Sequence, residues 1–325
     1  MTKNNERGQS MVITVVFMVV LLGFAALVID VGSWYRAHRS AQSTADAAAL
    51  AGAQVLPDSQ NASALALQYV NKNSSGGGPG TGGTTPQITI TQQGYEPDTI
   101  TVKVTRPAPG FFAKVFGSAF GSVNVSRSAT ARAYNVYGVR NGIAPITINY
   151  KHPLLHCTRT QSPTCAPEFG VPTTLTLEDI HQAGGKDAAG AFGLINLNGV
   201  QSGNIGAGEL TNWLLNGYQD HDLTVGQYDS APSANFNNSQ FTSALDQVIG
   251  QELLFPVYRL LKGPGSNAVY DIIGWVGFVI DSYSTSGSAG TIYGHFTRYT
   301  TDGTAAENGG GGAQGLGVHK IELTN

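Results

Sequence analysis

Histidines flanked by carboxylates are the first candidates for acid–base chemistry in this sequence. The tripeptide Asp220-His221-Asp222 places an imidazole between two carboxylates. Neighbours in sequence within a loop do not easily orient a nucleophile, and the chain has no Gly-x-Ser-x-Gly elbow. Glu178 and Asp179 are typical of a helix start rather than of a general acid and base. We therefore interpret His221 as part of a solvated turn and expect no catalytic residues.

The two cysteines are the next candidates, because Cys157 and Cys165 lie close together in a segment that also contains His152 and His156. One reading is a small disulfide-closed loop in an oxidising compartment. The alternative is a metal site made by both histidines and both thiols, although this spacing matches no common zinc module. We expect the disulfide, no metal and no cofactor.

The composition limits the classes of partner. The chain has 325 residues, of which 42 are glycine and 12% are charged, and its net charge is −3. Such weak charge argues against a nucleic-acid partner. The glycine-rich run at residues 73–86 is not a phosphate loop, because no Gly-Lys-Ser/Thr follows it. It predicts a flexible spacer.

An uncharged run that begins at Met11 and ends at Ile29 is 19 residues long, close to the length that a transmembrane helix needs. A cleaved secretory signal is the competing interpretation, since Lys3 and Arg7 supply a basic start. The flanking positive charges tie and do not set the orientation. A large region after one N-terminal span is commonly translocated, so we expect a cytoplasmic N-terminus and an extracytoplasmic C-terminal region.

The same helix is predicted to continue beyond the span, over residues 10–54, for about 67 Å at 1.5 Å per residue. Its second half carries small residues at helical spacing: Ala37, Ala41, Ala45, Ala48, Ala49, Gly52 and Ala53. A stripe of this kind permits close helix approach, so we expect it to pack against other helices. The alternative is that alanine occurs here only because of its high helix propensity.

The rest of the chain predicts a β-rich region with a few short helices, which makes the fold class α+β. The expected parts are residues 1–56, a transmembrane and projecting helix; 57–86, a short helix and glycine-rich linker; 87–138, a small α+β module; and 139–325, a β-rich domain with a glycine-rich loop at 302–317. Alternating or continuous apolar runs predict strands at 87–92, 99–106, 122–134, 146–150, 173–177, 194–197, 253–260, 269–284, 291–299 and 318–323. Helical patterns occur at 209–216 and 239–250, and residues 111–116 predict a helical turn that packs on the sheet. Residues 270–283 are expected to form a central strand buried on both sides.

The N-terminal pattern resembles the TadE/TadG-like proteins of Tad (Flp, tight-adherence) pilus assembly. The residues that carry the resemblance are Arg7-Gly8-Gln9-Ser10, the apolar run, Asp30-Val31-Gly32, Tyr35, Arg39, Gln42 and the run from Ala45 to Ala53. Three later segments are similar to the β-module that often follows in this family: Val104 to Pro107, Phe111 to Gly117 and Ser128 to Ala131. Members cut by the prepilin peptidase usually have a glutamate five residues after the glycine. Ile13 stands there in this chain, so we expect the N-terminus to be retained.

The resemblance implies a membrane-anchored, pilin-like accessory protein in pilus biogenesis and surface adhesion. Its expected partners are other pilin-like subunits, Tad assembly-machinery proteins and the lipid bilayer. The resemblance implies a location in the cytoplasmic membrane, with surface filaments as a second location for such a protein. The alternative is a membrane-tethered binding module or hydrolase that acts on envelope polymers. That alternative requires His152 or His221 to face a carboxylate and a nucleophile in one cleft.

Overall fold

The computed structural model describes most of the chain. The described residues are 6–74, 83–94, 96–117, 121–140, 142–158, 164–177, 191–200, 203, 205–264, 267–285, 290–305 and 315–324. They form two compact units. The N-terminal unit comprises Met1–Arg132 and Glu322–Asn325, and the C-terminal unit comprises Ala133–Ile321.

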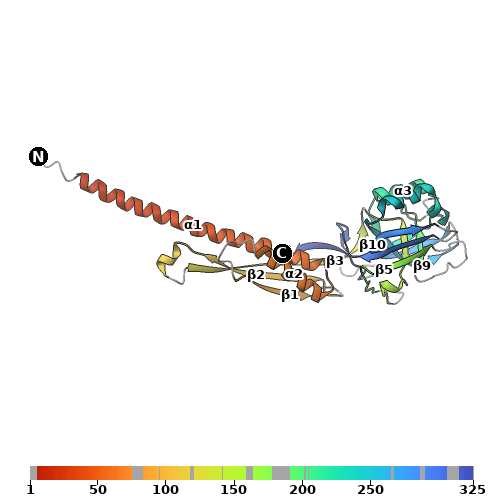
Figure 1. Ribbon diagram of the computed structural model, residues 1–325, viewed down its shortest axis with the longest axis horizontal. Coiled ribbons are helices and arrows are strands. Elements are labelled where there is room, and N and C mark those ends of the chain that lie inside the picture. Colours follow the sequence, from red (N-terminus) through yellow and green to blue (C-terminus); the bar gives the residue numbers. More distant parts are fainter. Residues whose placement is uncertain are drawn as a thin grey trace. The chain divides into compact units, whose positions relative to one another are not determined.

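The N-terminal unit combines two helices with a three-stranded antiparallel meander (Figure 1). Its elements are α1 (Glu6–Ala53), α2 (Ser59–Ser74), β1 (Thr85–Thr91), β2 (Thr99–Pro109), the 3-10 helix η1 (Ala113–Phe116) and the first part of β3 (Ser122–Val139). In Figure 1 the second half of α1 lies beside β2 and α2, and these are the elements that pack on it. Asp58 directly precedes α2 and caps it, because its carboxylate accepts a hydrogen bond from the backbone N–H of Asn61.

In β2 the alternation of apolar and polar residues in the sequence corresponds to a buried and an exposed face of the strand. Ile100, Val102 and Val104 are fully buried on one face, and the exposed Lys103 lies on the other. The register pairs Ile100 with Ile90 on β1 and with Ala131 on β3. The prediction of a half-buried hairpin strand in this region is confirmed.

The C-terminal unit is built mainly from strands. Its elements are the end of β3, β4 (Ile146–Asn149), η3 (Pro153–Leu155), β5 (Pro172–Leu177), β6 (Ala191–Leu194), α3 (Ala207–Asn216), β7 (Leu223–Thr224), β8 (Gly226–Asp229), η4 (Ser233–Asn237), α4 (Ser239–Val248), β9 (Glu252–Lys262), β10 (Val269–Ser284), β11 (Thr291–Thr297), β12 (Tyr299–Thr300), β13 (Thr304–Ala305) and β14 (Val318–Thr324), whose last residues belong to the N-terminal unit. The end of β3 pairs with β7 and β13, and β12 pairs with β14.

The largest sheet of this unit has the strand order β11-β5-β6-β4-β9-β10-β8. β10 also pairs with β11, so the strands from β11 to β10 close into a ring. β4 runs parallel to β9 and β5 parallel to β6, and the other pairs are antiparallel. β10 has the bounds that its apolar run predicts, and its residues from Ile272 to Phe278 are all buried. The expectation of a strand buried on both sides is confirmed for this stretch, whereas Asp281 and Ser282 near the end of the strand are exposed.

Aromatic side chains fill the core of this unit. The aromatic residues that are fully or almost fully buried include Phe192, Tyr218, Phe236, Phe241, Phe255, Tyr258, Tyr270, Phe278 and Phe296. α3 and α4 pack on each other and bury Trp213 and Leu245 among their apolar residues. Gly193 is needed where Tyr270 approaches, because a Cβ at this glycine would lie 1.9 Å from the tyrosine hydroxyl.

The fold class is confirmed: a long apolar N-terminal helix precedes a β-rich region with a few short helices. Several boundaries differ from the prediction. β1 begins at Thr85, inside the expected linker, and β6 ends at Leu194, where a strand was expected to begin. Short strands such as β7 and β13 have too few residues to show a period. The expected helix start at Glu178 and most of the expected loop at 302–317 lie outside the described residues.

Candidate functional site

The first half of α1 is apolar and uncovered. From Ser10 to Ile29 every residue except Ala26 is exposed, and Met11, Phe17 and Val28 are each more than 60% exposed. Among the helices that the structure describes, one is long and apolar enough to cross a membrane, and this helix is α1. A helix that is apolar on every side needs an apolar surrounding. The described part of the chain does not supply such a surrounding, because no residue in the most apolar 18-residue stretch of α1 is buried.

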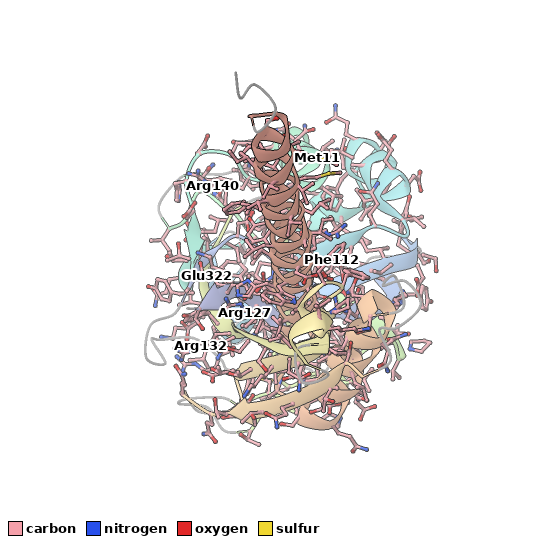
Figure 2. All side chains as sticks on the ribbon, turned by 90° about the vertical axis from the view of Figure 1, so that its left-hand side faces the viewer. Met11, Phe112, Arg127, Arg132, Arg140 and Glu322 are labelled. Atoms are coloured by element: carbon pink, nitrogen blue, oxygen red, sulfur yellow. A yellow bond between two sulfur atoms is a disulfide. The ribbon has the colours of Figure 1, made fainter. Side chains whose placement is uncertain are left out.

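Asp30 marks the change from the uncovered half of α1 to the packed half, because it is only 4% exposed. Its carboxylate accepts hydrogen bonds from the backbone N–H groups of Phe111 and Ala113, each at 2.6 Å, and of Phe112 at 3.1 Å. Successive N–H groups that converge in this way form a concave anion site. Figure 2 shows Phe112 beside α1. Asp30 therefore holds the turn between β2 and η1 against the helix.

Further polar contacts join α1 to the β2–β3 hairpin. The Ser33 hydroxyl donates to the carbonyl of Pro109 at 3.0 Å, and Arg106 donates to the Ser40 hydroxyl. His38 Nδ1 lies 3.3 Å from Nη2 of Arg127. From Ser33 the helix continues for about 28 Å to Gly52, and β2 covers about 30 Å between Pro109 and Ile100. The strand therefore matches the packed half of the helix in length.

The predicted stripe of small residues lies in this packed half. Ala41, Ala45, Ala48, Ala49 and Ala53 are fully buried, whereas Ala37 is half-buried. Ala62, Ala66 and Val70 form the buried face of α2. A Cβ at Gly52 would lie 2.5 Å from Cδ1 of Ile100 and 3.2 Å from Cβ of Ala66. The stripe thus allows this chain's own α2 and β2 to approach α1 closely, so in this structure its buried members are not available to another subunit.

One sequence expectation about the hairpin is wrong. Residues 111–116 were expected to pack a helical turn on the sheet, but Phe111 is 58% exposed and Val115 is 84% exposed. η1 is a single 3-10 turn at the tip of the hairpin, and its backbone is held by Asp30 rather than by the sheet face. Asp30 entered the sequence-based expectations only as one of the residues that carry the family resemblance, and its contact with the hairpin was not predicted. Its signal is a single carboxylate directly after an apolar run, in a helix that continues.

The cysteines form the expected disulfide, Cys157–Cys165, and the Thr158–Thr164 bridge lies beside it. Both sulfur atoms are therefore occupied, so neither is a thiolate ligand in this structure. His156 contacts Glu168 at 2.6 Å. Among the residues that the structure describes, no three His, Cys, Asp or Glu side chains come together as a metal site.

His152 is a buried structural residue. Its Nδ1 accepts a hydrogen bond from the backbone N–H of Leu154 at 3.2 Å, and its Nε2 lies 3.0 Å from the Thr173 hydroxyl. The ring also meets Phe296 edge-on. Burial lowers the pKa of His152 to about 4. These contacts fix a neutral imidazole that caps η3.

His221 lies near Tyr218, with 3.2 Å between Nδ1 and the phenol oxygen. Asp222 forms an ion pair with Arg140 at 2.7 Å, and both side chains are largely exposed. Burial raises the pKa of Tyr218, so the phenol is a neutral hydrogen-bond partner at physiological pH. The described contacts of His221 and His152 thus show capping and surface pairing, without the carboxylate–imidazole–nucleophile arrangement that the enzyme alternative requires.

α1 thus combines an apolar, uncovered half that could span a membrane with a second half that packs against a folded unit. Residues 8–55 match the model of the Tad family, described as putative Flp pilus-assembly TadE/G-like. This match confirms the resemblance of the N-terminal segment and relates the chain to Flp pilus assembly. No curated protein and no solved structure matches the chain.

Proposed function

We propose that this protein is a membrane-anchored, pilin-like accessory protein of a Tad/Flp-type pilus, acting in pilus biogenesis and surface adhesion without enzymatic activity. The observation that carries the proposal is the division of α1. One half is apolar and uncovered, the other half carries a folded β-hairpin, and both lie in the segment that matches the family model. Such a helix can hold a folded domain at a membrane surface.

The proposed partners are other pilin-like subunits, proteins of the assembly machinery and the lipid bilayer. The side chains of α1 that remain exposed beyond the apolar run include Tyr35, Arg36, Arg39 and Ser43. Because the buried alanines are occupied within the chain, contacts with other subunits would use these outward residues. Leucine at Ala41 or Ala45 would disturb the chain itself before it disturbed any assembly.

The proposed topology is a single span in the cytoplasmic membrane, with the N-terminus cytoplasmic and the C-terminal unit extracytoplasmic. The Cys157–Cys165 disulfide supports this orientation, because disulfides persist in oxidising compartments. Fusing alkaline phosphatase after residue 325 tests it, since that enzyme is active only outside the cytoplasm.

The first test of function is to shear surface filaments from cells and to probe the filament and membrane fractions for this protein. Presence in filaments would make it a minor structural subunit, and confinement to the membrane would make it an assembly or anchoring factor. A deletion strain with unchanged filaments and unchanged adhesion would contradict the proposal.

A matched pair of variants sharpens this test. Val19→Asp places a carboxylate at the centre of the apolar run, where a charge opposes membrane insertion by about 3 kcal/mol. Ser43→Asp adds the same carboxylate to the exposed side of the packed half. We expect Val19→Asp to lose membrane retention and filaments, and Ser43→Asp to keep membrane retention.

A further inference from the structure

The tip of the β2–β3 hairpin exposes large apolar side chains. Phe111 is 58% exposed, Phe112 44% and Val115 84%, and Val123 at the start of β3 is 41% exposed. Lys114 is also exposed, between Ala113 and Val115. Turns at hairpin tips are usually polar, so a cluster of exposed aromatic and aliphatic side chains indicates a binding surface.

The contact with Asp30 fixes where this tip lies along α1. Asp30 directly follows Ile29, the last residue of the apolar run, and it binds the backbone of Phe111, Phe112 and Ala113. The hairpin tip is therefore held at the end of the uncovered half of the helix, and Figure 1 shows it there.

The tip also extends along the apolar run itself. A groove of about 440 Å³ has walls from both elements: Gly23, Ala26, Leu27, Asp30, Val31 and Trp34 of α1, and Phe112, Ala113 and Val115 of the tip. Between Asp30 and Gly23 the helix rises about 10 Å. The apolar tip residues thus lie alongside the last two turns of the run that is expected to be in lipid.

We propose that the hairpin tip inserts into the same lipid leaflet as the end of the α1 span, so that the N-terminal unit contacts the membrane at two points. This inference rests on the proposed membrane anchorage of α1. Lipid is the occupant that the geometry favours, because the exposed tip is continuous with the uncovered apolar helix and shares a groove with it. A depth of about 10 Å is less than half the thickness of a bilayer core.

The polar groups at this level fit a membrane boundary. The Asp30 carboxylate would be unfavourable near hydrocarbon if it had no partners, but three backbone N–H groups satisfy it. Lys114 is long enough to direct its ammonium group toward lipid phosphates while its stem stays among apolar groups. Trp34 and Tyr35 follow one turn further along α1, as side chains at a membrane–water interface do.

The consequence would be a fixed orientation of the helix. A single span can rotate about its axis and tilt, whereas a second insertion point beside it restricts both motions. The side of α1 that bears Asp30 and Ser33 would face the hairpin, and the opposite side would face neighbouring molecules.

The test uses the full chain in phosphatidylcholine vesicles, with a single free cysteine labelled by an environment-sensitive NBD fluorophore. Cys157 and Cys165 are joined, so an introduced cysteine is the reactive thiol. Val115→Cys reports on the tip, Phe17→Cys on the middle of the apolar run, and Lys103→Cys on the exposed face of β2. Emission is recorded in ordinary vesicles and in vesicles of brominated lipid, which quench fluorophores that contact acyl chains.

We expect blue-shifted, bromine-quenched emission at residues 17 and 115 and neither effect at residue 103. If the label at residue 17 is quenched but the label at residue 115 behaves like the label at residue 103, the proposal for the tip is overturned and the anchorage of α1 stands. A blue shift at 115 without bromine quenching would mean that protein, such as a second copy, covers the tip, and would also overturn it. Absence of quenching at 17 would overturn the anchorage itself.

A second variant tests the role of Asp30 as a positioning residue. Asp30→Ala in the Val115→Cys background removes the acceptor for the three N–H groups, so quenching at 115 should fall. The same change in the Phe17→Cys background should leave quenching at 17 unaltered. Unchanged quenching at 115 would show that Asp30 does not place the tip, which would overturn the argument from which the proposal was derived.

Discussion

The core of the N-terminal unit is built around small side chains, whereas the core of the C-terminal unit is built from aromatic ones. Around α1 the buried positions are mostly alanine and glycine, with Ile100, Val102 and Val104 of β2 opposite them. In the C-terminal unit Phe255, Phe278 and the other buried aromatics fill the ring of strands. The first unit depends on backbones that approach closely, and the second depends on the volume of its side chains. Adding atoms should therefore harm the first, and removing atoms should harm the second.

The largest effect is expected from Phe278→Ala in the C-terminal unit. Phe278 is fully buried and lies 5.0 Å from Phe255 and 5.3 Å from Phe296 between ring centroids. Its loss should lower the free energy of unfolding by about 3–5 kcal/mol. Denaturant unfolding followed by the fluorescence of the buried Trp213 and Trp275 measures this change. Tyr293→Ala, at a 43% exposed position on β11, is the control and should have little effect. Equal effects of the two substitutions would refute the role of aromatic volume.

Acidification should also weaken the C-terminal unit selectively. The pKa of His152 is lowered from 6.5 to about 4 by burial, so the folded state keeps this imidazole neutral. The unfolded chain takes up the proton first, and stability that is fully present above pH 6.5 is lost as the pH falls toward 4. Through His152 alone, the free energy of unfolding should fall by about 3 kcal/mol over this pH range. The same direction applies to His319, whose pKa burial also lowers to about 4.

His152→Asn separates the His152 contribution from the rest. The asparagine carboxamide oxygen can still accept the bond from the Leu154 N–H, but the side chain does not titrate. Unfolding midpoints measured from pH 7 to pH 4 should fall less steeply in this variant than in the parent chain. Identical slopes would show that His152 is not the titrating group.

Reduction of the disulfide should give a somewhat smaller effect, confined to the C-terminal unit. Cys157 and Cys165 are separated by 8 positions, and closing a loop of this size stabilises a fold by about 2.5 kcal/mol through the entropy of the unfolded chain. Cys157→Ser with Cys165→Ser, compared with the parent under oxidising and reducing conditions, measures it. The double variant should not respond to reductant, and the parent should. A parent chain that unfolds at the same denaturant concentration in both conditions would contradict this prediction.

The smallest change, one added methyl group, tests the N-terminal unit. Gly52→Ala places a Cβ within 2.5 Å of Ile100 and should destabilise the packing of β2 on α1 by about 1–3 kcal/mol. Gly32→Ala adds the same atom where nothing lies within 4 Å, and should be neutral or stabilise the helix by about 0.5–1 kcal/mol. Hydrogen exchange of the β2 amides in the detergent-solubilised chain should become faster in the first variant alone. Equal exchange in both variants would mean that close approach at Gly52 is not needed.

Much of the secondary structure follows from the local pattern of residues. The apolar run from Met11 to Ile29 requires a helix that is covered by something other than water, and the alanine-rich continuation favours more helix. The continuous β-branched and aromatic run at 269–284 gives β10 with the predicted bounds. The cysteine spacing predicts the disulfide. These features depend on the period of the apolar residues, on helix and strand propensity and on the closure of a short loop. All three are determined by residues close together in the sequence.

Other features depend on residues far apart in the chain, and only the tertiary structure decides them. The sequence indicates that the stripe of small residues on α1 allows another element to approach closely. The structure shows that the elements packed on α1 are α2 and β2 of the same chain. The pairing of β10 with β11 closes the ring of strands, and no local pattern encodes that closure. Asp30 meets the backbone of residues 81 to 83 positions away, and backbone N–H groups leave no trace in residue type. A sequence shows which side chains need partners, whereas the partners are selected by the three-dimensional arrangement of the whole chain.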